Sequence, residues 1–569
     1  MARSVRPAAP AALPVSTPLA EVRAALLRRA RLRLLPRSDG AVADLLAEAV
    51  YLERRRFAEA RGGLSPEDSV ERDQIEDAAR AVHRGRAEQE TALLGLVGAY
   101  AGQIHNTFSP RTYRFATSVL PSGLSRILTA ADPGRGKGAA ADGAGAGWFG
   151  GHVDPLQRVH IRGDVALLQR LARTHTLILT PTHLSNMDSP LIGYALHAAG
   201  LPPFIYGAGL NLFSNPVMAF FMSRLGAYTV DRRKRHQLYK DTLKDYSTEA
   251  IGGGHHSLFF PGGTRARSGE VETDVKKGLL GTGLIAWQEA LRAEAAGGAP
   301  ARDVLVVPCA LSYAMVLEAE TLIEDALKES GQRRYIISDD EFSDSRSVAS
   351  FTRQILALDA SVIVHFGAPL DLFGNPVDEQ GRSLGRGGGP LDRRAYVLDR
   401  EGQLVEDPQR DRVYTDALSG ALVRAWHRDN TVMETHLVGY AAWRLLVAAS
   451  PRRSTWERMF LSEDERLLPR AALAEAVDRL RVALDAAVEA GALRSHLPSG
   501  ADRTEATLRL ALDRFSRFHS QPAVAEAGGG RVRVAPRLAL YYGNRLAHAG
   551  LGEVPLSAPA AGARPAETP

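Results

Sequence analysis

The chain has 569 residues, of which 45% are hydrophobic and 24% charged, and its formal net charge is +5. This composition excludes a largely disordered chain, and the length leaves room for two to four domains of roughly 100–200 residues each. The mild basic excess fits an anionic ligand or membrane surface. No recognition-module signature indicates nucleic-acid binding. The single cysteine, Cys309, excludes an intramolecular disulfide, a thiolate zinc cluster and a redox pair, fits a reducing compartment and is expected in the core.

The two ends and the apolar content bear on membrane and secretion signals. No run reaches the ~18 consecutive apolar residues that a membrane-spanning helix needs. Residues 1–18 lack a continuous apolar segment of secretory type. Residues 1–20 and 551–569 are rich in Ala and Pro and are expected to be disordered. We therefore expect a cytoplasmic protein, either free or bound at the membrane surface.

Between its ends the chain divides into regions of different texture. Residues 21–133 have apolar positions at helical spacing and predict an N-terminal helical domain, followed by a Gly/Ala-rich linker at 134–150. In residues 151–395, short β-branched or aromatic runs alternate with amphipathic segments. This alternation predicts an α/β domain with a mainly parallel sheet and helices on both faces. Residues 396–550 predict a C-terminal helical domain.

The α/β region can be divided into individual elements. Strands are expected at 176–180, 203–206, 227–230, 257–260, 304–307 and 361–366. Helices are expected at 188–199, 216–225, 233–251 and 282–295. The elements alternate along most of this region, so each turn that follows a strand is a candidate ligand site.

A first cluster of functional residues lies at 180–190, between an expected strand and an expected helix. His183 and Asp188 are five residues apart there. A histidine removes a proton from an alcohol near neutral pH, and a carboxylate on its other ring nitrogen fixes the tautomer. The same spacing also fits a strand-end histidine followed by an aspartate that caps a helix.

Two further clusters carry positive charge. Arg232 begins a basic run that ends at Arg235, after an expected strand, and guanidinium groups bind phosphate through a bidentate fork. Arg232 is the candidate phosphate-binding residue. Residues 233–235 are expected on the surface, where they could contact anionic lipid. At 260–269, a glycine turn carries Arg265 and Arg267, which face one anionic ligand if the segment is extended. Solvated arginines are the alternative in both places.

A fourth cluster, residues 306–313, is a strand end that contains Pro308 and indicates core on its own. Taken in order, the four clusters resemble the four sequence blocks of the glycerolipid acyltransferase family. The first block, a histidine, four residues and an aspartate, is matched by His183 to Asp188 with the typical serine at Ser185; the second by Gly226 to Arg232; and the fourth by Pro308.

The third block of that family usually reads Phe-Pro-Glu-Gly-Thr-Arg-Ser-Arg-Ser-Gly. The chain keeps eight of its positions, namely Phe260, Pro261, Gly263, Thr264, Arg265, Arg267, Ser268 and Gly269. Gly262 stands where the pattern has glutamate. The long flanking helical regions, residues 365–370 and residues 540–548 are similar to the glycerol-3-phosphate branch of the family.

The resemblance implies acylation of the sn-1 hydroxyl of glycerol-3-phosphate, with acyl-CoA or acyl-carrier protein as donor. Because the acyl product is a lipid, we expect the protein to be peripheral, at the cytoplasmic face of a membrane. His183 would be the general base and Asp188 would orient it. The substrate-binding residues implied are Ser185, Arg232, Gly263, Thr264, Arg265, Arg267 and Pro308, and neither a metal nor a bound cofactor is implied.

Alternatives remain open at this stage. The acceptor could be lysophosphatidate or dihydroxyacetone phosphate, or the protein could be a non-catalytic lipid- or acyl-carrier-binding protein, an idea to which Gly262 lends support. Residues 210–225 are strongly apolar and precede the basic run. Such a segment fits either a helix lying in a membrane interface or a helix covering the sheet.

Overall fold

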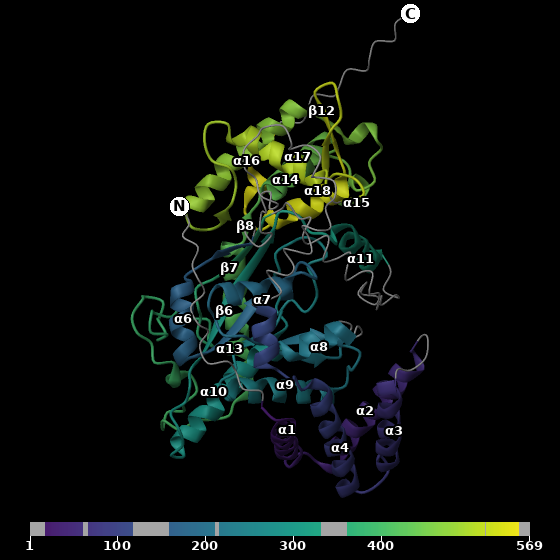
Figure 1. Ribbon diagram of the computed structural model, residues 1–569, viewed down its shortest axis with the longest axis vertical. Helices are drawn as coiled ribbons and strands as arrows, with labels where there is room; N and C mark the ends of the chain where they lie inside the picture. Colours follow the sequence, from purple (N-terminus) through teal and green to yellow (C-terminus); the bar gives the residue numbers. More distant parts are fainter. Residues whose placement is uncertain are drawn as a thin grey trace, which may run out of the picture.

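The computed structural model describes residues 17–60, 66–117, 159–210, 216–331, 361–517 and 519–556. The N-terminal helices lie at one end of the molecule, the large sheet lies in the middle, and the C-terminal helices lie at the other end (Figure 1). The predicted linker at 134–150 falls outside the described residues.

A seven-stranded sheet forms the centre, in the order β1-β7-β6-β2-β5-β3-β4. Its strands are β1 (Val159–Arg162), β2 (Thr176–Pro181), β3 (Ile205–Gly209), β4 (Ala227–Val230), β5 (Ser257–Leu258), β6 (Val304–Tyr313) and β7 (Val362–Phe366). The pairs from β6 to β4 are all parallel, β7 runs antiparallel to β6, and β1 is parallel to β7. The prediction of a mainly parallel sheet is confirmed.

Each of the six predicted strands overlaps an observed one, with two differences that matter. The edge strand β1 was not predicted, and only one of its four residues is fully exposed. Strand β6 continues to Tyr313 and is buried throughout, whereas the sequence predicted an end at residue 307. Cys309 lies inside this strand, fully buried as predicted, and burial raises the pKa of its thiol.

Helices cover both faces of the sheet, as predicted. On one face, Leu177 and Leu179 of β2 share a core with α6 (Val165–Thr174) and α7 (Asp188–Ala198). On the other, Ile178 shares a core with α10 (Lys277–Ala295) and α13 (Pro408–Asp429). Alternation along β2 therefore divides the core into two, and each fully buried leucine or isoleucine contributes roughly 1.5–3 kcal/mol.

The N-terminal region is helical, as predicted, and its described helices include α1 (Leu19–Leu34), α2 (Asp39–Ala58), α3 (Pro66–Ala81) and α4 (Arg86–Ile104). Helix α1 begins inside the segment that was expected to be disordered up to residue 20. These helices share a core with β4 and α9 (Gln237–Gly252), to which Tyr228, Leu238 and Tyr246 contribute. The N-terminal region is therefore packed on the β4 edge of the sheet.

The C-terminal region packs around α14 (Glu434–Ala449). Its other described helices are α15 (Thr455–Arg458), α16 (Arg470–Glu489), α17 (Arg503–Phe515) and α18 (Pro536–Gly543). The central region also contains α8 (Pro216–Arg224) and α11 (Ala319–Gly331). Small sheets are formed by β9 (Leu467–Pro469) with β11 (Val524–Glu526) and β12 (Arg531–Val534), and by β8 (Thr431–Val432) with β10 (Arg494–Ser495). Leu551 is buried, so the packed chain extends into the predicted tail.

Candidate active site

His183 and Asp188 meet in the turn between β2 and α7. The Nδ1 atom of His183 lies 2.7 Å from Oδ2 of Asp188. A carboxylate can only accept, so Nδ1 carries the hydrogen and Nε2 is left as the basic nitrogen. The two side chains are therefore in contact, an arrangement that suits a general base with an orienting carboxylate, and their catalytic roles stay a prediction.

Asp188 is completely buried and is held by several donors. Its Oδ2 also accepts the backbone N–H groups of Leu184, at 2.6 Å, and Ser185, at 3.0 Å. Its Oδ1 accepts the hydroxyl of Tyr313, at 2.5 Å. A buried carboxylate is stable only when such donors compensate its lost hydration. Asp188 thus fixes both the turn and the imidazole.

Tyr313, the last residue of β6, was missed as a functional residue because its block indicated only core. Burial, and then the nearby charge of Asp188, raise the pKa of Tyr313 well above its ordinary value, so the hydroxyl keeps its proton and donates. The signal that could have revealed Tyr313 is the alternation of side chains along a strand. Residues 309, 311 and 313 lie on the same face of β6, and β6 pairs with β2, the strand that leads to His183. The full length of β6 was needed to use it.

The third block closes over the histidine. The rings of His183 and Phe260 stack with their centroids 4.3 Å apart, and the His183 side chain is 16% exposed. The backbone N–H of Ala266 donates to the His183 carbonyl at 2.8 Å. The imidazole therefore keeps some exposure while the third block holds it in place.

Glycines in the third block make room for neighbouring elements. Gly263 has φ +76°, and a Cβ there would lie 2.6 Å from the Lys276 side chain. Gly269 has φ +80°, and a Cβ there would lie 2.0 Å from the backbone oxygen of Tyr541. Side chains at these positions would strain the backbone and collide with their neighbours. Gly263 thus shapes the loop, whereas Thr264 is exposed on it.

Arg265 lies close to the first block through a shared neighbour, Glu318. Ser185 Oγ donates to Glu318 at 2.9 Å, and the backbone N–H of Asn186 donates to it at 3.0 Å. Burial raises the pKa of Glu318, while these bonds and the positive charge of Arg265 oppose the rise. The Ala266 bond to the His183 carbonyl places the neighbouring Arg265 backbone beside this turn, and the side chains of Arg265 and Arg267 are both partly buried.

Two predicted substrate-binding residues lie beneath the surface. The Ser185 hydroxyl is buried, and besides its bond to Glu318 it accepts the backbone N–H of Met187 at 3.1 Å. Pro308 is buried inside β6, in register with Thr180, and its carbonyl accepts the N–H of Gly367 at 2.8 Å. In this structure both residues hold backbone in place around the site.

The second block ends at the C-terminal ends of the parallel strands, the same end of the sheet at which His183 lies. Through the parallel ladders, Leu179 of β2 aligns with Leu258, Tyr206 and then Ala227 of β4. His183 and Asp231 lie four residues beyond Leu179 and Ala227, so Arg232 emerges almost level with the histidine. Three strand spacings separate β2 from β4, about 14 Å. The Arg232 side chain is exposed at that end.

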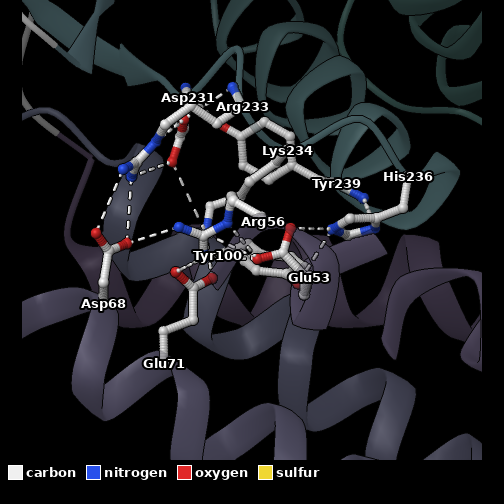
Figure 2. Close-up of polar contacts among 10 residues, drawn as sticks. All are labelled: Glu53, Arg56, Asp68, Glu71, Tyr100, Asp231, Arg233, Lys234, His236 and Tyr239. Atoms are coloured by element: carbon white, nitrogen blue, oxygen red, sulfur yellow. Dashed lines mark hydrogen bonds and ion pairs between the residues drawn. The ribbon is translucent and has the colours of Figure 1, made fainter. Parts of the chain in front are cut away.

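The basic run after Arg232 does not all lie on the surface. Only 2% of the Lys234 side chain is exposed, and its Nζ pairs with Glu71 and lies 3.9 Å from Glu53 (Figure 2). The expectation that residues 233–235 are all surface residues is therefore wrong for Lys234. Both acidic partners come from the N-terminal helices, far away in sequence, so the local charge run could not reveal them.

A network of charges extends this contact to other residues that follow Arg232. Arg56 of α2 contacts Glu53 at 2.6 Å and Glu71 at 2.8 Å. Asp68 pairs with Arg56, at 2.7 Å, and with Arg233, at 3.2 Å (Figure 2). His236 Nε2 lies 3.3 Å from Glu53 Oε1. The loop that carries Arg232 is thus fixed to α2 and α3.

The segment 540–548, noted in the sequence only for its resemblance, contacts the third block directly. Asn544 Nδ2 donates to the Ser268 carbonyl at 2.8 Å. The buried guanidinium of Arg545 donates to the Leu311 carbonyl at 3.1 Å and to Asn430 at 2.7 Å. The C-terminal region therefore supports the third block from behind.

Neither a cluster of metal-ligating side chains nor a membrane-spanning helix occurs in the residues that the structure describes. Within those ranges, no group of three or more His, Cys, Asp or Glu side chains is arranged to hold a metal ion. No helix in the same ranges is long and apolar enough to cross a membrane.

Comparison with known proteins gives consistent matches. Residues 162–312 match the family described as Acyltransferase. A glycerol-3-phosphate acyltransferase of Xylella fastidiosa (strain M23) is 27% identical over 201 residues, which are 35% of this chain and 21% of the relative. That of Glaesserella parasuis serovar 5 is 32% identical over 152 residues, 26% of this chain and 17% of the relative. The chain thus matches about a fifth of the length of these curated relatives.

Proposed function

Because residues 162–312 carry an acyltransferase domain, we propose that the protein is a glycerol-3-phosphate O-acyltransferase. It transfers a fatty acyl group from acyl-CoA or acyl-carrier protein to the sn-1 hydroxyl of glycerol-3-phosphate, in phospholipid biosynthesis. The observation that carries the proposal is the His183–Asp188 contact of 2.7 Å at the C-terminal end of β2, next to the arginines of the third block.

The dyad accounts for the proton transfers of the reaction. Nε2 of His183 takes the hydroxyl proton as the alcohol oxygen attacks the thioester carbonyl carbon, and Asp188 stabilises the imidazolium. The new C–O bond forms as the carbonyl electrons move to oxygen. When that tetrahedral intermediate collapses, the C–S bond breaks and the leaving thiolate takes the proton from the imidazolium. The thioester is already activated, so no enzyme nucleophile is needed.

The positive side chains suit a phosphorylated acceptor. Arg265 precedes Ala266, whose backbone N–H donates to the His183 carbonyl, and Arg267 follows on the same loop. Arg232 emerges at the same end of the sheet. Guanidinium groups bind phosphate through parallel N–H donors, which fixes orientation as well as charge. An acceptor held by its phosphate would present a hydroxyl to Nε2, and such positioning lowers the barrier of an otherwise bimolecular step.

A panel of acceptors tests the proposal. The full chain is assayed with palmitoyl-CoA and palmitoyl-acyl-carrier protein against glycerol-3-phosphate, lysophosphatidate, dihydroxyacetone phosphate and glycerol. We expect the highest kcat/KM with glycerol-3-phosphate and little transfer to glycerol, which lacks the phosphate. Preference for another phosphorylated acceptor would move the protein to that branch. Absence of transfer with every pair would support a non-catalytic binding protein instead.

We also propose that the protein acts at a membrane surface, peripherally and on the cytoplasmic face. Support comes from α8, where Phe220 is 48% exposed and the guanidinium of Arg224 lies 3.9 Å from its ring centroid. An exposed aromatic ring beside a cation suits the interface of an anionic bilayer.

Vesicle flotation tests this surface role, with vesicles of phosphatidylcholine alone and with added phosphatidylglycerol. We expect binding to the anionic vesicles that weakens with salt and is reduced in Phe220→Ser. Phe115 is 50% exposed on a different segment, and its change to Ser is the matched control. Equal binding by both variants, or none by the unmodified chain, would contradict the role of α8.

A further inference from the structure

Gly262 leaves a space that another residue fills. A Cβ built on Gly262 would lie 3.1 Å from Cγ of Glu272 and 3.3 Å from its Oε1. The family pattern has glutamate at this position of the third block, whereas Glu272 lies ten residues further along the chain. A carboxylate therefore lies next to the vacant side-chain position, and it comes from elsewhere in the sequence.

Glu272 contacts the backbone of the catalytic histidine. Its Oε1 accepts the backbone N–H of His183 at 2.5 Å. The carbonyl of the same residue is held by Ala266, so the third block and the segment after it bind His183 through both of its backbone polar groups. A hydrogen bond to a carboxylate is shorter and stronger than one to a neutral acceptor. This contact restricts the backbone position of His183, and thereby the place of its imidazole ring.

The carboxylate is sealed inside the protein. Its Oε2 is shielded from solvent and has no hydrogen-bond partner among the described residues, although other atoms of Glu272 keep some exposure. Burial raises the pKa of Glu272, and the His183 amide and the charge of Arg545 oppose the rise. A carboxylate kept at such a site without a role would cost stability.

We propose that Glu272 is a positioning residue of this active site, and that it replaces the glutamate which the family pattern has at position 262. The proposal rests on the proposed acyltransferase function. Gly262 and Glu272 then form one unit, because glycine at 262 admits the Glu272 side chain. The departure at Gly262 is thus compensated in space, and it does not mark a decayed site.

If Gly262 and Glu272 form one unit, glutamate side chains cannot occupy positions 262 and 272 at the same time. A side chain at 262 would press on Glu272 Cγ, and two carboxylates in one buried place repel. The backbone at Gly262 is outside the positive-φ region, so a side chain is compatible with its conformation. A glutamate can therefore be moved from one position to the other, which gives the proposal a sharp test.

The first variants remove the carboxylate. For Glu272→Ala we expect kcat to fall about 10²-fold, the effect of a misplaced catalytic group, with KM for the acceptor little changed. Glu272→Gln keeps an oxygen acceptor for the His183 amide and should lose less. Glu270→Gln, an exposed carboxylate of the same loop, is the matched control and should keep the full rate. A change confined to KM for the acceptor would overturn the positioning role.

The second set moves the carboxylate. Gly262→Glu alone and Glu272→Gly alone should each lower kcat, whereas the double variant should recover at least tenfold over Glu272→Gly. Residues in contact give such non-additive effects. A double variant no faster than the product of the single effects would refute the exchange. Circular dichroism of each variant identifies any that fail to fold, and Glu272→Gln, which preserves shape, then carries the test.

A readout independent of activity separates this proposal from the proposed function. Hydrogen–deuterium exchange at the His183 amide should be slow in the unmodified chain, faster in Glu272→Ala, and slow again in the exchanged double variant. If the chain transfers no acyl group but this pattern holds, the function is wrong and the contact stands. If acyl transfer is present but the amide exchanges equally in all variants, the positioning role is refuted.

Discussion

At the scale of single residues, the site depends on how a buried carboxylate is satisfied. Asp188 accepts two backbone N–H groups, the His183 ring and the Tyr313 hydroxyl. The dyad was a candidate from the sequence because His183 and Asp188 are only five positions apart. Tyr313, Glu272 and Glu318 lie 89 to 133 positions from their partners, and nothing in their own neighbourhood indicates which group each will contact.

Tyr313→Phe should weaken both stability and catalysis. Removing the hydroxyl leaves Oδ1 of the buried Asp188 without the donor that Tyr313 supplies, and hydrogen bonds to charged groups contribute about 1.5–3 kcal/mol. We expect the free energy of unfolding, measured in urea, to fall by that amount, and kcat to fall with little change in KM.

Tyr541 supplies the matched control for this variant. Its hydroxyl is also buried, but it has no hydrogen-bond partner among the described residues. Tyr541→Phe should therefore leave the free energy of unfolding close to that of the unmodified chain. Equal losses in the two variants would show that the Tyr313 hydroxyl contributes nothing specific to Asp188.

At the scale of elements, the hydrophobic pattern of the sequence predicted the sheet and the helices that cover it. It did not predict ion pairs between residues that lie far apart in the chain. The alternation of strands and helices predicted the mainly parallel sheet, and the central strands β2 and β6, which are buried throughout, contain apolar runs. Lys234 was expected on the surface because a run of like charges is usually solvated. Its acidic partners lie on α2 and α3 and become visible only when those helices pack against the loop after β4.

Lys234→Met tests the connection between the N-terminal helices and the second block. The change leaves Glu53 and Glu71 buried with less positive charge, and breaking a buried ion pair costs about 3–5 kcal/mol. We expect the free energy of unfolding to fall by that amount and KM for glycerol-3-phosphate to rise, because the loop carrying Arg232 loosens. Arg235→Met, at an exposed neighbour, is the control. Similar stabilities for the two variants would contradict a structural role for the buried network.

At the scale of the whole molecule, buried histidines join distant regions and make stability depend on pH. Burial lowers the pKa of His256, which directly precedes β5, and of His548, near the C-terminus, to about 4 each. Burial also lowers the pKa of His436 in α14 to about 3. His256 Nδ1 accepts the Leu177 N–H at 3.0 Å, a bond that a protonated ring could not make.

The sign of the pH effect follows from these shifts. Below pH 6.5 these histidines bind protons in the unfolded chain but stay neutral in the native one. Their contribution to stability is therefore complete above pH 6.5 and is lost as pH falls toward 4. Each histidine contributes a slope of up to about 1.4 kcal/mol per pH unit. Urea unfolding at pH 7, 6 and 5 should show this loss, with a smaller slope in His256→Gln. A free energy of unfolding that is constant from pH 7 to 5 would contradict it.

The central claim is that His183 deprotonates an alcohol whose phosphate is held nearby, and one comparison tests it most directly. Acyl transfer to glycerol-3-phosphate is measured for the unmodified chain, for His183→Ala, and for His197→Ala, which removes a partly buried histidine from α7. The account predicts that His183→Ala lowers kcat about 10²–10⁴-fold, the contribution of general base catalysis, while His197→Ala keeps the rate. A His183→Ala variant that transfers acyl groups as fast as the unmodified chain would contradict the account.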